Sequence, residues 1–213
     1  MGICLGVPYL EYEDIRQGAN VFLGRYYPAK SIPLPIERIV EQNLQLDIVP
    51  IPNLLKDHRV DGFIKSNGRE IVIDEFICDR RPARYRFTLA HEVGHLQMHL
   101  GLFTKVGIGR VQDWIAFWND LSEKSRRYLE WQANAFAGLV LVPGEHLESE
   151  IRSWVGKFSR EIIIARNAKI SEESIEDQLR KAISDQICLR FEVSPEVINR
   201  RIDKEGFILS AML

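Results

Sequence analysis

Two histidines four residues apart, with a glutamate directly after the first, are the feature that most constrains this chain. Residues 86–95 read RFTLAHEVGH and contain His91, Glu92 and His95 as an HExxH motif. On an α-helix, residues four apart lie one turn above each other, so both imidazoles can bind one zinc ion at about 2.0–2.1 Å. The glutamate then lies next to the metal, where it can act as a base. The motif predicts a helix that carries half of a zinc site.

The residues around the motif support a buried helix. At about 100° per residue, an apolar stripe and a histidine stripe fall on different faces. The apolar stripe is Leu89, Val93, Leu96 and Leu100, and the histidine stripe is His91, His95 and His99. Ala90 and Gly94 form a narrow third face. We expect this face to let a neighbouring helix approach closely.

A catalytic zinc needs a third protein ligand, which must come from elsewhere in the chain. Residues 128–140 (YLEWQANAFAGLV) have helical spacing and place Glu130 and Asn134 one turn apart. Small residues on this helix would let it approach the histidine helix. We expect Glu130 to bind zinc, and the Asn134 carbonyl to accept the outer N–H of His91 and so fix its tautomer.

The alternative third ligand is His99, which lies one further turn, about 6 Å, beyond His95 on the same helix. That distance is poor for ligation, so we expect His99 beside the ligands or at the rim of the site. Acidic side chains in less periodic stretches are weaker alternatives: Asp113, Asp120 and Glu123. Gln132, about 200° round the helix from Asn134, is expected to take no part in the site.

The blocks RFTLAHEVGHLQMH and ExxANAFAGLVLVP resemble the ImmA/IrrE family of bacterial and phage zinc metallopeptidases, whose members carry HExxH and a later glutamate in an ExxAN segment. The likeness covers about residues 60–143. Matched residue by residue, it implies His91, His95 and Glu130 as zinc ligands and Glu92 as the catalytic base. It also implies that the partner is a helix-turn-helix repressor, whose cleavage switches on genes for stress response or mobile-element transfer.

A second class of function stays open, in which zinc only stabilises a regulatory or toxin–antitoxin component that binds a partner without proteolysis. This alternative rests on residues 187–202, which look like a helix-turn-helix. Glu92 favours the enzyme, because a purely structural zinc needs no base. An enzyme would also need a donor for the developing oxyanion, and four neighbours of the motifs are open candidates: Arg84, Tyr85, His99 and Tyr128.

Three segments near the motif bear on substrate binding. Residues 60–74 hold two strand-like runs joined by Asn67-Gly68, a strong hairpin signal. The edge of this hairpin either pairs with an extended peptide beside the zinc or only covers the helices. Residues 79–86 are rich in arginine and are expected to be a solvated loop. Residues 101–124 lose helical periodicity, and their aromatic side chains fit either ordinary core or a pocket wall: Phe103, Trp114, Phe117 and Trp118.

The pattern predicts an α+β protein of two parts. Residues 1–143 are expected to form a zincin-like metallopeptidase domain with a small antiparallel sheet and the HExxH helix, and residues 144–213 a small helical appendage. Beside the metal helices, we expect helices at 12–26, 36–44, 145–158 and 172–191, a short one starting at Ser194-Pro195, and a strand at 46–51. With 213 residues, 46% of them hydrophobic, the chain can bury one sizeable core and a small second unit.

Charge and cysteine content limit partners and location. The chain has 28 Lys+Arg against 30 Asp+Glu, and acidic residues offset the basic ones in the last helix, so we do not expect direct nucleic-acid binding. Three scattered cysteines, Cys4, Cys78 and Cys188, favour a reducing compartment. The N-terminus lacks the pattern of a signal peptide, and no stretch approaches the roughly 20 apolar residues of a membrane span. We therefore expect a cytoplasmic protein with no membrane contact.

Overall fold

The structure is a computed structural model that describes residues 7, 9–29 and 31–212. It divides into two compact units, residues 1–30 with 34–140, and residues 31–33 with 141–213. The expectations about the N-terminus and about Cys4 concern residues outside the described ones. Within the described part of the chain, no helix combines the length and the apolarity that a bilayer span requires.

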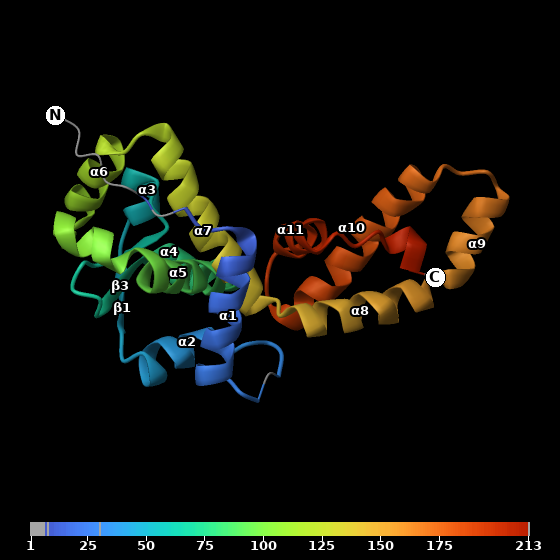
Figure 1. Ribbon diagram of the computed structural model, residues 1–213, viewed down its shortest axis with the longest axis horizontal. Helices are drawn as coiled ribbons and strands as arrows, with labels where there is room; N and C mark the ends of the chain where they lie inside the picture. Colours follow the sequence, from blue (N-terminus) through green and yellow to red (C-terminus); the bar gives the residue numbers. More distant parts are fainter. Residues whose placement is uncertain (1–6, 8, 30, 213) are drawn as a thin grey trace. The chain divides into compact units, whose positions relative to one another are not determined.

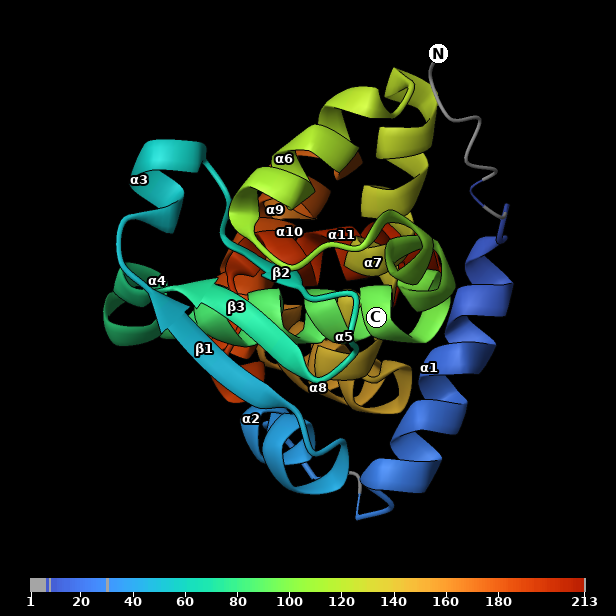
Figure 2. The ribbon, with the colours of Figure 1, turned by 90° about the vertical axis from the view of Figure 1, so that its left-hand side faces the viewer.

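The first unit packs helices around a three-stranded sheet, and Figure 2 shows the strands running across one side of α5. Its strands are β1 (Asp47–Ile51), β2 (Gly62–Ile64) and β3 (Glu70–Asp74). Its helices are α1 (Tyr12–Tyr26), α2 (Ile36–Arg38), the π-helix η1 (Ile39–Asn43), α3 (Leu54–His58), α4 (Glu75–Arg80), α5 (Pro82–Val106), α6 (Val111–Asp120) and α7 (Glu123–Leu141). The prediction of a helix at 12–26 is confirmed, whereas the one predicted at 36–44 is α2 followed by η1.

The sheet confirms the α+β class but not its expected strand directions. The predicted hairpin is present, since β2 and β3 pair antiparallel with Phe63 opposite Val72. However, β1 pairs parallel with β3, with Val49 opposite Val72, so the sheet is mixed and the expectation of an antiparallel sheet is wrong. Alternation of apolar residues predicts a strand but does not encode the direction of a partner more distant in the chain. The strand order β1-β3-β2 leaves β2 at an edge.

The metal helix is longer than the sequence pattern indicates. Helix α5 continues past Gly101, an exposed glycine that an established helix tolerates at a cost of about 1 kcal/mol. The prediction of a solvated loop at 79–86 is also wrong, because α4 ends at Arg80 and Pro82 already begins α5. Proline suits that first position since its fixed φ is helical and its missing N–H would have no partner. From the first turn of α5, Arg84 makes a bidentate ion pair with Asp61, with Nε 2.6 Å from Oδ2 and Nη2 2.7 Å from Oδ1.

Helices α5 and α7 approach closely at Gly94. A Cβ at this position would lie 3.2 Å from both Cα and the carbonyl oxygen of Ala133, and 3.3 Å from Cβ of Phe136. Because two of these atoms belong to the α7 backbone, they cannot move aside independently of the helix. The glycine therefore sets how near the histidines of α5 lie to the residues of α7.

The second unit is helical. It comprises α8 (Gly144–Lys157), α9 (Ser159–Asn167), α10 (Glu172–Phe191), α11 (Pro195–Glu205) and the 3-10 turn η2 (Leu209–Met212). The predicted helix at 172–191 is confirmed, with Ser171 as its N-cap, and so is the helix that starts at Ser194-Pro195. Arg201 of α11 is buried and donates from Nε to the Val142 carbonyl, while Arg200 pairs with Glu196. The absence of direct nucleic-acid binding stays a prediction.

Replacing Gly94 with alanine is expected to lower the free energy of unfolding by about 1–3 kcal/mol, because the added methyl group overpacks the contact with α7. Gly101→Ala in the same helix is the control, since a Cβ there meets nothing within 4 Å. That change should raise stability by about 0.5–1 kcal/mol. Urea denaturation measures both, and equal stability of the two variants would contradict the close approach of the helices.

Candidate metal centre

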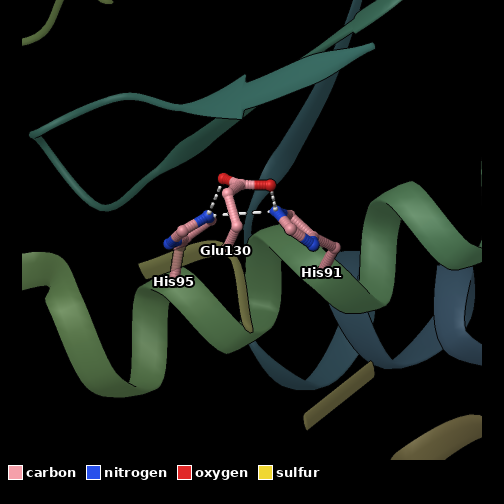
Figure 3. A group of neighbouring side chains, drawn as sticks. All are labelled: His91, His95 and Glu130. Carbon is pink, nitrogen blue, oxygen red and sulfur yellow. Dashed lines mark hydrogen bonds and ion pairs between the residues drawn. The ribbon is translucent and has the colours of Figure 1, made fainter. Parts of the chain in front are cut away.

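Three side chains from two helices converge on one point, as Figure 3 shows. His91 and His95 project from α5 with their Nε2 atoms 3.0 Å apart. Glu130 of α7 lies opposite, with Oε2 at 3.7 Å from His91 Nε2 and Oε1 at 3.6 Å from His95 Nε2. The HExxH spacing accounts for the two histidines, because residues four apart share one helix face. The close approach of α7 brings in the third side chain.

The donor atoms of this triad fit a metal ion. Ligands held tetrahedrally at about 2.0–2.1 Å from zinc lie about 3.3 Å from one another. The separations of 3.0, 3.6 and 3.7 Å bracket this value. Two imidazole nitrogens and one carboxylate oxygen are also a donor set of catalytic zinc sites, in which a fourth position stays open. Among the described residues, the group close enough to share an ion is His91, His95 and Glu130, without His99.

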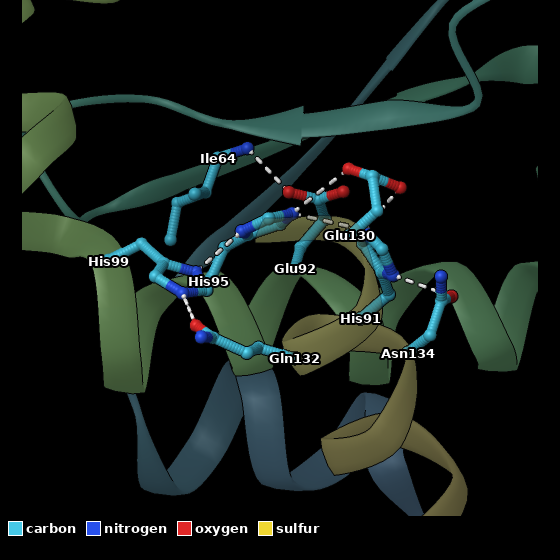
Figure 4. Close-up of polar contacts among 8 residues, drawn as sticks. All are labelled: Ile64, His91, Glu92, His95, His99, Glu130, Gln132 and Asn134. Atoms are coloured by element: carbon cyan, nitrogen blue, oxygen red, sulfur yellow. Dashed lines mark hydrogen bonds and ion pairs between the residues drawn. The ribbon is translucent and has the colours of Figure 1, made fainter. Parts of the chain in front are cut away.

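Hydrogen bonds hold the outer sides of both histidines (Figure 4). His91 Nδ1 lies 3.1 Å from Asn134 Oδ1, the contact expected from the sequence. Since an amide oxygen only accepts, Nδ1 of His91 carries a proton, and Nε2 is the ring nitrogen that faces the triad. His95 Nδ1 lies 2.9 Å from Nδ1 of His99, which is therefore behind His95. His99 Nε2 in turn lies 2.6 Å from Gln132 Oε1.

Gln132 corrects an expectation. Helical geometry turns it away from Asn134, so it was expected to take no part, yet it is fully buried and bonded to His99. Gln132 contacts His99, whereas Asn134, on another face of α7, contacts His91. A signal was present in the sequence, because Gln132 is a polar residue on the apolar stripe that contains Leu129 and Phe136. A polar group in such a stripe needs a buried partner.

Burial and the contacts between the side chains of the site shift the pKa values of its ionisable groups. Burial disfavours the carboxylate of Glu130, but its bonds to the two histidines outweigh this and hold its pKa below the usual range. Burial likewise disfavours an imidazolium at His91, yet the Glu130 carboxylate raises the pKa of His91 to about 9. For His95, burial dominates and lowers the pKa to about 3. Burial raises the pKa of Glu92 to about 7, which suits a group that must take up and return a proton near neutrality.

A cleft of about 430 Å³ opens onto the triad. Its lining includes His58, Arg59, Val60, Asp61, Gly62, Phe87, Thr88, His91, Glu92, Trp114, Ile115, Trp118, Asn119, Glu130 and Asn134. Glu92 is only 3% exposed, and its Oε2 accepts the backbone N–H of Ile64 at 2.9 Å. This bond ties the HExxH glutamate to the edge strand β2 (Figure 4).

The aromatic residues of 101–124 serve both roles left open by the sequence. Phe103 and Phe117 are buried core. Trp114 stacks on Trp118 with ring centroids 5.3 Å apart and meets the ring of His95 edge-on at 6.2 Å. Both tryptophans line the cleft, so α6 forms a wall that runs outward from the metal centre.

The four candidates for an oxyanion donor do not line this cleft. Tyr85 donates to Glu37 at 2.7 Å, Arg84 is paired with Asp61, Tyr128 packs edge-on against Tyr9, and His99 lies behind His95. The polar side chains that the sequence did not single out and that do line it are His58, Arg59, Asp61, Thr88 and Asn119. They come from α3 and its end, from the residue before β2, from α5 and from α6, and no short motif links them.

Replacing Glu130 with alanine is expected to remove the bound metal, because two ligands on one helix form too weak a chelate when the third is absent. Glu123→Ala is the matched control, since Glu123 is an exposed residue of the same helix that pairs with Arg127. Mass spectrometry of protein dialysed against zinc should give one ion per chain for wild type and for Glu123→Ala. Full occupancy in Glu130→Ala would show that another residue completes the site.

Comparison with known proteins agrees with this site. The model of the IrrE N-terminal-like domain, a peptidase family, matches residues 44–203. The match extends on both sides of the likeness recognised at about 60–143 and includes both helices of the triad. No curated protein matches the chain. Since the match covers well over half of the sequence, the chain belongs to the IrrE N-terminal-like family of metallopeptidases, as the resemblance to ImmA/IrrE proteins predicted.

Proposed function

We propose that this protein is a zinc-dependent endopeptidase that cleaves a helix-turn-helix transcriptional repressor in the cytoplasm and so relieves repression. The observation that carries the proposal is a triad of potential metal donors at a cleft that His91, Glu130 and Glu92 line, beside an edge strand. A site that only stabilised the fold would need neither the cleft nor Glu92. The repressor as partner is carried over from the family resemblance.

The residues of the site divide the chemistry of peptide hydrolysis between them. His91, His95 and Glu130 would hold the zinc, which supplies a Lewis acid that polarises a carbonyl and lowers the pKa of water. Glu92 takes a proton from the attacking water as the new C–O bond forms. It then gives the proton to the nitrogen as the C–N bond breaks, so that the leaving group departs as a neutral amine. The Ile64 N–H fixes the position of Glu92 during both transfers.

The edge strand β2 offers a place for the substrate main chain. The Asp61 carbonyl accepts from the Asp74 N–H and the Lys65 N–H donates to the Glu70 carbonyl, each at 2.9 Å. Because bonding alternates along an antiparallel strand, the backbone N–H and C=O groups of Gly62 and Ile64 point away from β3. Gly62 lines the cleft, and a Cβ there would lie 2.7 Å from the Val72 carbonyl oxygen. An extended peptide can therefore pair with Gly62 and pass over the metal centre. This placement favours a substrate segment that is unfolded or strand-like when it is cut.

Replacing Glu92 with glutamine is expected to cut peptide hydrolysis by on the order of 10²-fold or more, because the amide cannot take up the proton. The amide oxygen can still accept the Ile64 N–H, so folding and zinc content should stay at wild-type values. The assay follows cleavage of a purified helix-turn-helix repressor, with gel electrophoresis and mass spectrometry of the fragments. Unchanged cleavage by Glu92→Gln would refute the mechanism, and a wild-type protein that binds the repressor without cutting it would favour the regulatory alternative.

The wall formed by Trp114, Ile115 and Trp118 is expected to favour a large apolar side chain next to the scissile bond. Peptides that span the cleavage site, with leucine or aspartate at each flanking position in turn, measure this preference. Wild type should favour leucine over aspartate at one position by about 10-fold or more in kcat/KM, and Trp118→Ala should reduce that ratio. If Trp118→Ala lowered kcat/KM equally for the leucine and the aspartate peptides, Trp118 would support the cleft without selecting the substrate.

A further inference from the structure

Both candidate metal-binding histidines are connected to an amide of α7. For His91 the connection is direct, through Asn134. For His95 it passes through His99, which spans the distance to Gln132. His95 and Gln132 have no exposed surface and His99 is 2% exposed, so water does not compete for these bonds. The same helix therefore supplies the carboxylate of the triad and the ends of both hydrogen-bond chains.

The chain from Gln132 to His95 can carry its protons in two ways. If the Gln132 carbonyl accepts from His99 Nε2–H, then Nδ1 of His99 is bare and accepts from Nδ1–H of His95. In this arrangement, Nε2 of His95 presents a lone pair to the triad. If instead the Gln132 amide donates, every proton shifts by one place and His95 carries a proton on Nε2. That proton would point at His91 Nε2, 3.0 Å away, and would block the metal.

We propose that Gln132 and His99 form a buried relay that holds His95 in the Nδ1–H tautomer and so prepares its Nε2 for the metal ion. In the structure it is Gln132 Oε1 that faces His99, at 2.6 Å, which is the orientation that gives this polarity. Gln132 and His99 are positioning residues, because they act through His95. Asn134 does the same for His91 without an intermediate residue.

The relay concerns the metal site and not proteolysis, although it rests on the same triad as the proposed function. Its tests read the proton positions and the metal affinity directly. A protein that binds zinc as described but cuts no repressor would overturn the proposed function and leave the relay intact. A protein that cuts the repressor but has the reversed histidine tautomers would overturn the relay and leave the proposed function intact.

Nuclear magnetic resonance of metal-free protein labelled with ¹⁵N-histidine tests the polarity. Imidazole nitrogen shifts separate a protonated from a bare nitrogen, and the chain has only five histidines. His58→Gln and His146→Gln identify the signals of the two histidines that belong to neither the triad nor the relay. The relay predicts that His99 carries its proton on Nε2 and His95 on Nδ1. A proton on Nδ1 of His99 would overturn it.

Gln132→Met tests the effect on metal affinity, because methionine keeps the length and shape of glutamine but accepts no comparable hydrogen bond. Zinc affinity, measured by competition with a chromophoric chelator, should fall by about 10–100-fold. Gln97→Met makes the same exchange at an exposed position of α5 and should keep wild-type affinity. Wild-type affinity in Gln132→Met would overturn the proposal. If Gln132→Met does not fold, the tautomers of the wild-type protein decide the question.

Discussion

The close approach of α5 and α7 is the contact on which the rest of the site depends. Gly94 lies against the backbone at Ala133, where an added Cβ would make tight contacts of 3.2 Å. Glu130 stands three residues before Ala133 on α7, and its carboxylate oxygens reach within 3.6 and 3.7 Å of the histidine nitrogens. A wider spacing of the helices would move this carboxylate out of ligand range. The packing that favours a glycine at this position is thus the packing that brings the candidate metal ligands together.

The two partners of α5 take different roles. Helix α7 supplies a carboxylate and two amides at alternate positions, Glu130, Gln132 and Asn134, and these contact the three histidines of α5. Strand β2 holds Glu92 through a single backbone N–H of Ile64. The HExxH glutamate is therefore positioned from the sheet side, and the histidines of α5 are positioned from the helix side.

The sequence predicts those features that depend on local spacing. The HExxH helix, the Asn67-Gly68 hairpin and the helix at 172–191 follow from periodicity and turn chemistry, and the structure contains all three. It does not predict features that depend on how distant elements meet. The parallel pairing of β1 with β3 is one example, and the bond between His99 and Gln132, 33 residues apart, is another. A helical wheel gives the face of a side chain but not which residue on the next helix it meets.

X-ray absorption spectroscopy of the zinc-loaded protein tests the central claim most directly, because multiple scattering from imidazole rings counts the histidine ligands. The three-donor site predicts two imidazole nitrogens and oxygen ligands at about 2.0–2.1 Å, with no sulfur. Three imidazoles would place a third histidine, His99 or the cleft residue His58, on the metal and contradict the role of Glu130, and His99 in that position would contradict the relay as well. Sulfur at about 2.3 Å would mean that zinc binds at a cysteine and that the triad of α5 and α7 is not the metal centre.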